Sequence, residues 1–177
     1  MSTLRVPLTK EDHIQGNETA FVTLIEYGDY QCRYCGTAFT VIKEVQHHFS
    51  KKLKFAFRNF PLEDIHPYAR IAAEIAEFAE EKGHFWEMHD LIYENQEHLG
   101  MPLLIELTQT LGLPVKDLEV ALENETFLAK IQKDCLGGVR SGVKETPTFF
   151  INENRYKGKI KLNDLIQAID SILVNQK

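Results

Sequence analysis

Cys32 and Cys35 stand three positions apart in this chain of 177 residues. Apolar residues recur at helical spacing from Cys32 onward, so both thiols fall on the first turn of a predicted helix. Free amide groups and the helix dipole stabilise a thiolate at that place. The spacing therefore predicts a redox pair, with Cys32 as the nucleophile and Cys35 as the thiol that resolves a mixed disulfide formed on Cys32.

The same spacing also occurs in structural zinc sites, which need four ligands and usually supply two of them as a second cysteine pair. No second pair exists in this sequence, because the third cysteine, Cys135, is about a hundred residues away. We therefore expect no metal and no separate cofactor, with the Cys32–Cys35 disulfide as the redox group. A zinc-holding or peptide-binding module stays open as an alternative.

Glu26 lies in a run of apolar and aromatic residues, 21–27, that predicts a buried strand. An unpaired carboxylate is costly to bury, so this residue needs a chemical or structural reason. One hypothesis is that Glu26 accepts the proton of Cys35, with a pKa raised by burial. The alternative is an ion pair with Arg58, which falls on the next predicted strand.

Three further positions are candidates for contacts with a substrate. Arg33 adds positive charge beside Cys32 and favours its thiolate, and Tyr34 can pack against a docked substrate or cover the helix end. Pro147 stands at the first residue of a short predicted strand, 148–151, where an X-Pro bond such as Thr146–Pro147 can be cis.

The remaining pattern predicts the elements that hold these residues. A strand at 53–58 follows the first helix and is expected to pair with the first strand in parallel. Five helical segments are then expected, near 67–82, 84–94, 102–111, 114–123 and 125–139. Gly83 and other helix-breaking residues separate them. A hairpin at 148–157 and an amphipathic helix at 162–173 complete the chain.

Within the last of the helical segments, Cys135 shares a predicted apolar stripe with Leu128, Ile131 and Val139. This position favours a small core residue over a reactive thiol. The aromatic residues of the helical block are expected to form its own core; they are Phe78, Phe85, Trp86 and Tyr93. His66 is expected to satisfy the start of a helix or to line a groove above Cys32.

The segment from Glu26 to Cys35, Glu-Tyr-Gly-Asp-Tyr-Gln-Cys-Arg-Tyr-Cys, and the segment 146–151, Thr-Pro-Thr-Phe-Phe-Ile, resemble the DsbA-like branch of the thioredoxin superfamily. Further similarity lies at 60–62, 66–67 and 83–90, so the resemblance covers nearly the whole chain. It implies an α/β protein with a thioredoxin fold interrupted by an all-helical subdomain. Residues 1–62 and 140–177 would form the thioredoxin-like domain and 63–139 the insertion.

The resemblance also implies roles for particular residues. Cys32 and Cys35 match the catalytic positions, Glu26 matches the position of a buried acid, and Pro147 would be cis and face the cysteines, with Thr146 offering backbone hydrogen bonds to a peptide. The expected activity is thiol–disulfide exchange with protein or peptide substrates. A relative acting on glutathione conjugates is the other enzyme considered. The Arg-Tyr dipeptide between the cysteines departs from the Pro-His of DsbA, so the redox direction is left open.

The composition limits the partners and the compartment. A net charge of −6 argues against nucleic acid, and no apolar run approaches the length of a membrane span, so a soluble protein is expected. No signal peptide is visible, which predicts a cytoplasmic chain as written, or an exported, periplasmic one if a leader was removed. The redox partner could be thioredoxin, glutathione or a membrane oxidase, and the sequence does not choose among them.

Overall fold

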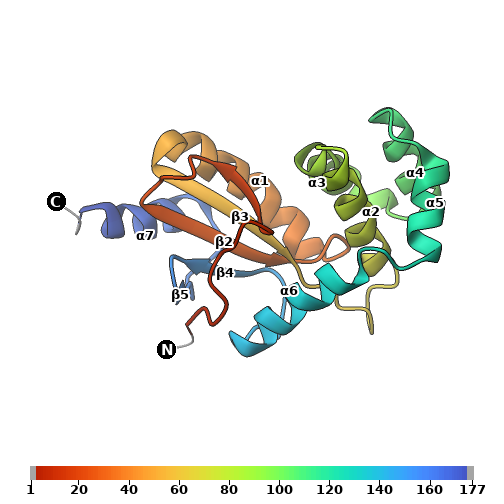
Figure 1. Ribbon diagram of the computed structural model, residues 1–177. Helices are drawn as coiled ribbons and strands as arrows, with labels where there is room; N and C mark the ends of the chain where they lie inside the picture. The colour runs from red at the N-terminus through yellow and green to blue at the C-terminus, as the bar shows by residue number, and fades with distance from the viewer. Residues whose placement is uncertain (1–2, 175–177) are drawn as a thin grey trace.

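The computed structural model describes residues 3–174 and contains one mixed sheet with helices on both faces and a helical block beyond one end (Figure 1). The strands are β1 (His13–Gly16), β2 (Val22–Gly28), β3 (Leu53–Asn59), β4 (Thr148–Ile151) and β5 (Asn154–Arg155). The α-helices are α1 (Arg33–Phe49), α2 (Ala69–Glu81), α3 (Phe85–Glu94), α4 (Met101–Thr110), α5 (Val115–Glu123), α6 (Leu128–Arg140) and α7 (Leu162–Val174), and two 3-10 turns are η1 (Ser50–Lys52) and η2 (Gln96–His98).

The sheet has the order β1-β3-β2-β4-β5. β2 and β3 pair in parallel and α1 connects them, while β4 runs antiparallel to β2 and β5 antiparallel to β4. The predicted elements are therefore present, although β5 is shorter than expected and covers only Asn154–Arg155. The thioredoxin-type fold with helices inserted between β3 and β4 is confirmed.

Strand β1 was not expected from the sequence. It pairs antiparallel with β3 at the edge of the sheet, and its four residues show no alternation of apolar and polar side chains. His13 is buried because it contacts the helical block: its Nε2 lies 2.8 Å from Glu77 Oε1, and its ring stacks on Phe85. A strand stabilised by such distant contacts leaves little local signal.

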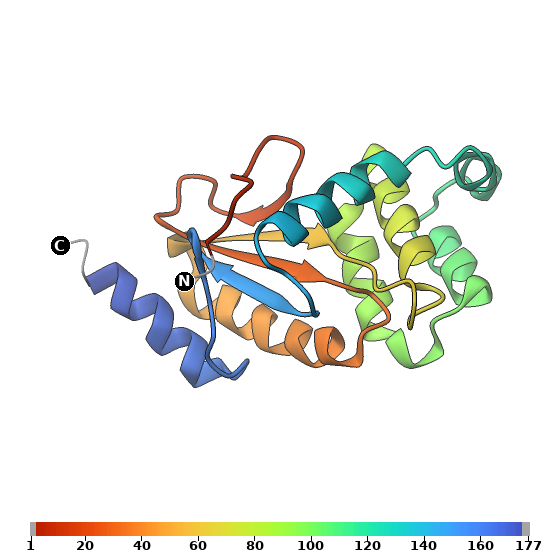
Figure 2. The same ribbon diagram turned by 90° about the horizontal axis from the view of Figure 1, so that it is seen from below.

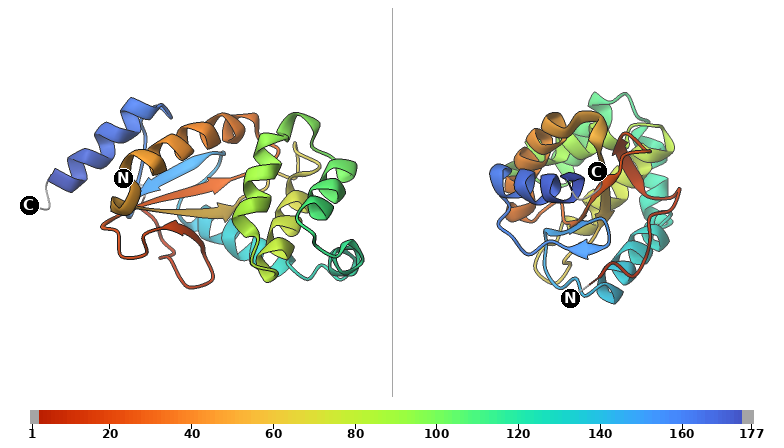
Figure 3. Two further views of the ribbon diagram at one scale, coloured as in Figure 1. Left: turned by 90° about the horizontal axis from the view of Figure 1, so that it is seen from above. Right: turned by 90° about the vertical axis from the view of Figure 1, so that its left-hand side faces the viewer.

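The two faces of the sheet carry separate clusters of apolar side chains. Leu24 and Phe55 face the side covered by α1 and α7, and this cluster continues into the helical block. Ile25, Ala56 and Phe150 belong to a smaller cluster on the other face, where α6 lies against β3. Figure 2 and the end-on view of Figure 3 show the sheet between α6 on one side and α1 with α7 on the other.

Helix α6 approaches the sheet through glycines rather than through an apolar stripe. A Cβ on Gly138 would lie 3.1 Å from the ring of Tyr27 in β2 and 2.7 Å from the Phe60 ring, and a Cβ on Gly137 would lie 3.5 Å from the Tyr27 hydroxyl. Val139, which the sequence pattern placed on the apolar side, is 61% exposed, so that part of the prediction was wrong. Because α6 contacts both the sheet and the helical block, the expected division at 139/140 stays a prediction.

The helical block, α2 to α5, lies at the end toward which β2 and β3 run (Figures 1 and 2). Its core is aromatic, as expected: Phe78, Phe85 and Tyr93 are buried and Trp86 is partly buried. Helix α2 ends at Glu81 with Lys82 as its C-cap, and the following Gly83 has a φ of +79°, which is the left-handed conformation that glycine adopts readily. The block is thus placed next to the loop that joins β2 to α1.

Candidate active site

Cys32 is the residue that precedes α1, so its sulfur stands at the helix N-terminus. It is 4% exposed, and its Sγ lies 3.3 Å from the carbonyl oxygen of Thr146, to which the thiol can donate. No acidic residue occupies the first turn of α1. The positive end of the helix dipole therefore acts on Cys32 without a competing carboxylate in that turn.

The pKa of Cys32 is lowered from 9.0 to about 5. The largest cause is a hydrogen bond from the Cys35 thiol, and the Thr146 side chain and the backbone amides of Cys35 and Tyr34 act in the same direction. Burial opposes the shift. A thiolate on Cys32 thus takes the place of the oxygen that usually caps a helix at this position.

Cys35 lies one turn further into α1 and is fully buried. Its pKa is raised well above 9.0 by burial, by its hydrogen bond to Cys32 and by the nearby charge of Glu26. Both cysteines are free thiols in this structure. The two sulfurs therefore have opposite tendencies: the outer one ionises readily and the inner one keeps its proton.

Glu26 is 3% exposed, and its Oε1 has no hydrogen-bond partner among the described residues. Burial raises its pKa from 4.5 to about 8, and the charge of Cys32 contributes to the rise. The same carboxylate helps to raise the pKa of Cys35. Glu26 is therefore electrostatically coupled to both cysteines, as a proton-accepting role requires.

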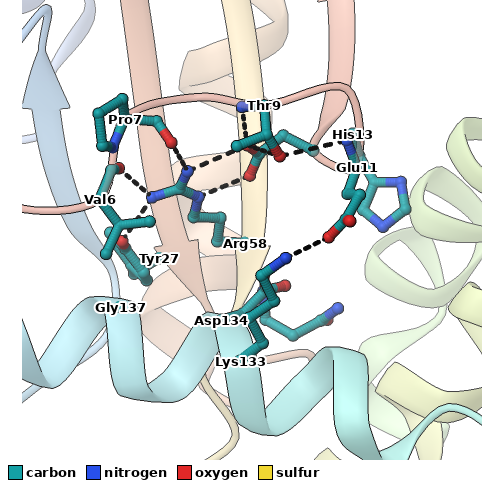
Figure 4. Close-up of polar contacts among 12 residues, drawn as sticks. Val6, Pro7, Thr9, Glu11, His13, Tyr27, Arg58, Lys133, Asp134 and Gly137 are labelled. Carbon is teal, nitrogen blue, oxygen red and sulfur yellow. Dashed lines mark hydrogen bonds and ion pairs between the residues drawn. The ribbon is translucent and has the colours of Figure 1, made fainter.

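The alternative of an ion pair between Glu26 and Arg58 is wrong. Glu26 is registered opposite Phe57, whereas Arg58 is opposite Tyr27, and neighbouring residues of a strand point to opposite faces. Figure 4 shows Arg58 turned toward Val6 and Pro7 of the N-terminal segment. The guanidinium donates to both carboxylate oxygens of Asp12, at 2.6 and 3.0 Å, and to the carbonyl oxygen of Val6. Arg58 is thus a structural residue of the opposite face.

The peptide bond between Thr146 and Pro147 is cis, as the resemblance implied. The carbonyl oxygen of Thr146 faces the Cys32 sulfur. Pro147 lines one end of an open groove of about 490 Å³ that also includes Arg155, Tyr156 and Lys157. The cis-proline loop therefore lies between the cysteine pair and this groove.

Arg33 and Tyr34 are both exposed, and the Arg33 guanidinium lies 5.6 Å from the centroid of the Tyr34 ring. Tyr34 is 66% exposed, so it does not cover the helix end as a buried residue would. The main causes of the lowered pKa of Cys32 are groups other than Arg33. The structure thus favours a surface role for these two side chains.

Two residues of the site, Asp29 and Gln96, were not singled out from the sequence, whereas His66, expected at the start of a helix or in a groove above Cys32, has its Nδ1 2.8 Å from Asp29 Oδ2. Asp29 is 1% exposed and its carboxylate receives hydrogen bonds from both sides of the site. Gln96, in η2, donates its amide to the carbonyl oxygens of Tyr30 and Cys32 at 2.7 and 2.9 Å. No sequence signal identifies Gln96, because it meets Cys32 only through the packing of the helical block.

Gly36 shows how closely Gln96 approaches the redox helix. A Cβ at Gly36 would lie 2.2 Å from Gln96 Oε1, so a larger residue would displace this side chain. The close contact at the residue directly after Cys35 therefore arises from the inserted helices and not from the conformation of α1.

Cys135 lies outside this site. Its Sγ is 3.7 Å from the carbonyl oxygen of Asn59, and burial raises its pKa to about 12. Among residues 3–174 no group of three or more His, Cys, Asp or Glu side chains is placed to hold a metal ion. No helix in the same range is long and apolar enough to cross a membrane.

Comparison with known structures identifies the fold. The chain superimposes on oxidised BdbD from Bacillus subtilis with a TM-score of 0.84 and 24% identity, covering 93% of this chain and 94% of the other. It also superimposes on α-DsbA1 from Wolbachia pipientis with a TM-score of 0.83 and 20% identity, covering 98% of both chains. The fold is therefore that of DsbA-like proteins.

The thioredoxin family model matches residues 8–171, and the chain belongs to this family. Among curated sequences it is similar to the Na(+)/H(+) antiporter NhaA 1 of Salinispora arenicola, with 38% identity over 169 residues, and to NhaA 3 of Salinispora tropica, with 35% over 175 residues. These matches cover 95% and 98% of this chain but 26% and 27% of the antiporters. The chain thus spans about a quarter of the length of these relatives.

Proposed function

We propose that the protein is a thiol–disulfide oxidoreductase that exchanges disulfides with protein or peptide substrates through Cys32. The observation that carries this proposal is the opposite shift of the two thiols: the pKa of Cys32 falls to about 5, while that of Cys35 rises well above 9.0. A thiolate is the nucleophile of disulfide exchange, so Cys32 is ionised and can attack a disulfide, whereas Cys35 stays protonated until the second step. The antiport activity named for the relatives is not part of this proposal.

The exchange follows from these positions. When the pair is reduced, the Cys32 thiolate attacks a substrate disulfide, a mixed disulfide forms on Cys32, and one substrate sulfur leaves as a thiolate. Cys35 then loses its proton to Glu26 and attacks Cys32 Sγ; the Cys32–Cys35 disulfide forms, and the second substrate thiolate leaves. The substrate gains two electrons in this direction. The reverse sequence transfers the disulfide to a dithiol substrate.

The electrostatic coupling between Glu26 and Cys32 explains why Glu26 accepts the proton of Cys35 only after the mixed disulfide has formed. The negative charge on Cys32 helps to keep Glu26 protonated, with a pKa of about 8. Formation of the mixed disulfide removes that charge, so the pKa of Glu26 falls and the carboxylate becomes able to accept a proton. Glu26 is thus available as a base when Cys35 must ionise.

The surroundings of Cys32 support a protein or peptide substrate. The large side chains Tyr34, Ile65 and Tyr68 are 66%, 67% and 38% exposed. Tyr68 lies close to the redox loop, because its amide donates to Gln31 Oε1 at 2.6 Å. On the other side, Pro147 opens on the groove described above. A polypeptide would contact Thr146, Pro147, Arg33 and Tyr34 as it reaches Cys32.

The stabilised thiolate favours the reduced form of the pair, and therefore the donation of disulfides. Cysteine pKa values are about 7 in thioredoxin and about 3.5 in DsbA. The value of about 5 for Cys32 lies between them. We expect a reduction potential between those two proteins, in the range of about −270 to −120 mV. The compartment, cytoplasmic or periplasmic, stays a prediction.

Reduction of insulin disulfides by dithiothreitol tests the proposal. Wild-type protein should accelerate it, Cys32→Ser should abolish the acceleration, and Cys35→Ser should accumulate a mixed disulfide with the substrate. Cys135→Ser is the matched control and should keep wild-type activity. Full activity of the Cys32→Ser protein would refute the proposal. Turnover of glutathione conjugates without turnover of proteins, or stoichiometric zinc without titratable thiols, would favour the two alternatives.

A further inference from the structure

The carboxylate of Asp29 joins two parts of the molecule that are distant in sequence. Its Oδ1 accepts the backbone amides of Gln31 at 2.7 Å and Cys32 at 3.2 Å. Its Oδ2 accepts the amide of Leu62 at 2.8 Å and lies 2.8 Å from His66 Nδ1. One side chain thus holds the redox loop on one oxygen and the segment leading to α2 on the other.

The backbone of Asp29 adds contacts to both cysteines. Its carbonyl oxygen accepts the amide of Cys32 at 3.1 Å, and its own amide lies 3.5 Å from Cys35 Sγ. Asp29 therefore touches the residue that precedes α1 and the sulfur one turn inside it. Its carboxylate has 0% side-chain exposure, so these contacts are made without competition from solvent.

These contacts explain how Cys32 comes to use the helix amides. The Cys32 backbone must be fixed as the residue before α1 if its sulfur is to reach the amides of Tyr34 and Cys35. An aspartate that binds the amide two residues further on fixes such a turn. The link to Leu62 and His66 then prevents the turn from moving relative to the helical block.

We propose that Asp29 is a positioning residue for thiol–disulfide exchange, which anchors the redox loop to the segment 62–66 and so keeps Cys32 Sγ on the N-terminal amides of α1. The proposal rests on the function proposed above. Asp29 does not contact a substrate and donates no proton to it. It acts through Cys32.

The sign of one measurement separates positioning from a plain charge effect. Removing a negative charge near a thiol lowers its pKa, because the thiolate is less repelled. Releasing the sulfur from the helix amides raises its pKa. Asp29→Ala removes the charge and also releases the loop, so the two effects on the pKa of Cys32 oppose each other. The positioning role predicts a net rise in that pKa.

The test is the pH titration of thiolate absorbance near 240 nm in reduced, folded protein carrying Cys135→Ala. We expect Asp29→Ala to raise the pKa of Cys32 by about one unit, a tenfold loss of thiolate below that pKa, and to lower the reduction potential by about 30 mV. Asp29→Asn keeps one acceptor oxygen for the loop amides and should restore more than half of the shift.

Asp134→Asn is the matched control. Asp134 is a second buried carboxylate that accepts a backbone amide, that of Asn59 at 3.2 Å, but its hydrogen bonds go to Asn59 and Lys130 and not to the redox loop. It should reduce the thermal stability without moving the pKa of Cys32. An unchanged or lowered pKa in folded Asp29→Ala protein would overturn the proposal.

The titration needs no substrate, so its outcome is independent of the insulin assay. A wild-type protein that titrates near pH 5 but reduces no disulfide would refute the proposed function and leave the positioning role intact. A wild-type protein that turns over insulin while Asp29→Ala keeps its thiolate pKa would refute the positioning role alone.

Discussion

Glu26 offers the sharpest quantitative test of the site, because it is a buried carboxylate with one oxygen that has no hydrogen-bond partner within residues 3–174. In the unfolded chain its carboxyl ionises at about 4.5, and in the folded protein it holds its proton up to about pH 8. The folded state therefore binds more protons between these values, and stability is lost as the pH rises through this window. A glutamine at this position has a similar shape but does not ionise, so the protein would not lose stability in this way as the pH rises.

The expected magnitude follows from the shift. At pH 7 the pH is about 2.5 units above the unfolded pKa, and each unit is worth about 1.36 kcal/mol. Glu26→Gln should therefore increase the free energy of unfolding by about 3 kcal/mol at pH 7, by almost nothing at pH 4, and by a constant amount above about pH 8.5. The increase should be smaller in the oxidised protein, since the charge of Cys32 contributes to the raised pKa only when the thiolate is present.

Urea denaturation of the reduced protein at a series of pH values measures this difference directly. Glu44→Gln, on the exposed side of α1, is the control and should show no such pH dependence. A gain in Glu26→Gln that is equal at pH 4 and pH 8, or absent at both, would refute the assignment of a neutral buried carboxyl. In the insulin assay the same variant should accumulate the mixed disulfide, because Cys35 has lost its proton acceptor.

Three further experiments test other parts of the structure. Gly36→Ala should displace Gln96 and reduce the melting temperature and the insulin activity. In a Gln96→Ala background, which already lacks the Gln96 hydrogen bonds, Gly36→Ala should cause little further loss of melting temperature, whereas additive losses would contradict the contact. Arg58→Met should cost about 3–5 kcal/mol in urea denaturation, because it leaves the buried Asp12 carboxylate unpaired, without changing the pKa of Cys32; a change in that pKa would contradict a purely structural role. Iodoacetamide at pH 7 should label Cys32 rapidly and Cys135 slowly, since the pKa of Cys135 is about 12, and mass spectrometry would expose the opposite order.

The position of the redox pair could be predicted from the sequence because it depends on local geometry. Two cysteines three apart at the start of an apolar helical pattern must share one turn. The buried strand, the parallel pairing and the stop of α2 at Gly83 also follow from residues close together in the chain. Glu26 was identified as a buried acid for the same reason, because a charged residue within an apolar strand can be recognised from the sequence alone.

Tertiary structure alone decided which partners these residues meet. Arg58 pairs with Asp12 and not with Glu26, because the register of β2 and β3 places the two side chains on opposite faces. Strand β1 pairs with β3, and its His13 contacts Glu77 of α2. These contacts join segments 46 and 64 residues apart in the chain. Hydrophobic periodicity carries no information about such pairs.

The cysteine pair shows most clearly which features the sequence determines and which depend on the tertiary structure. The sequence by itself determined that Cys32 would stand at a helix N-terminus and Cys35 behind it. It did not determine that Asp29 would hold the loop to the segment 62–66, or that Gln96 would reach the carbonyl of Cys32. A helix start is a local property of the chain, whereas the groups that surround it are brought there by the packing of the inserted helices.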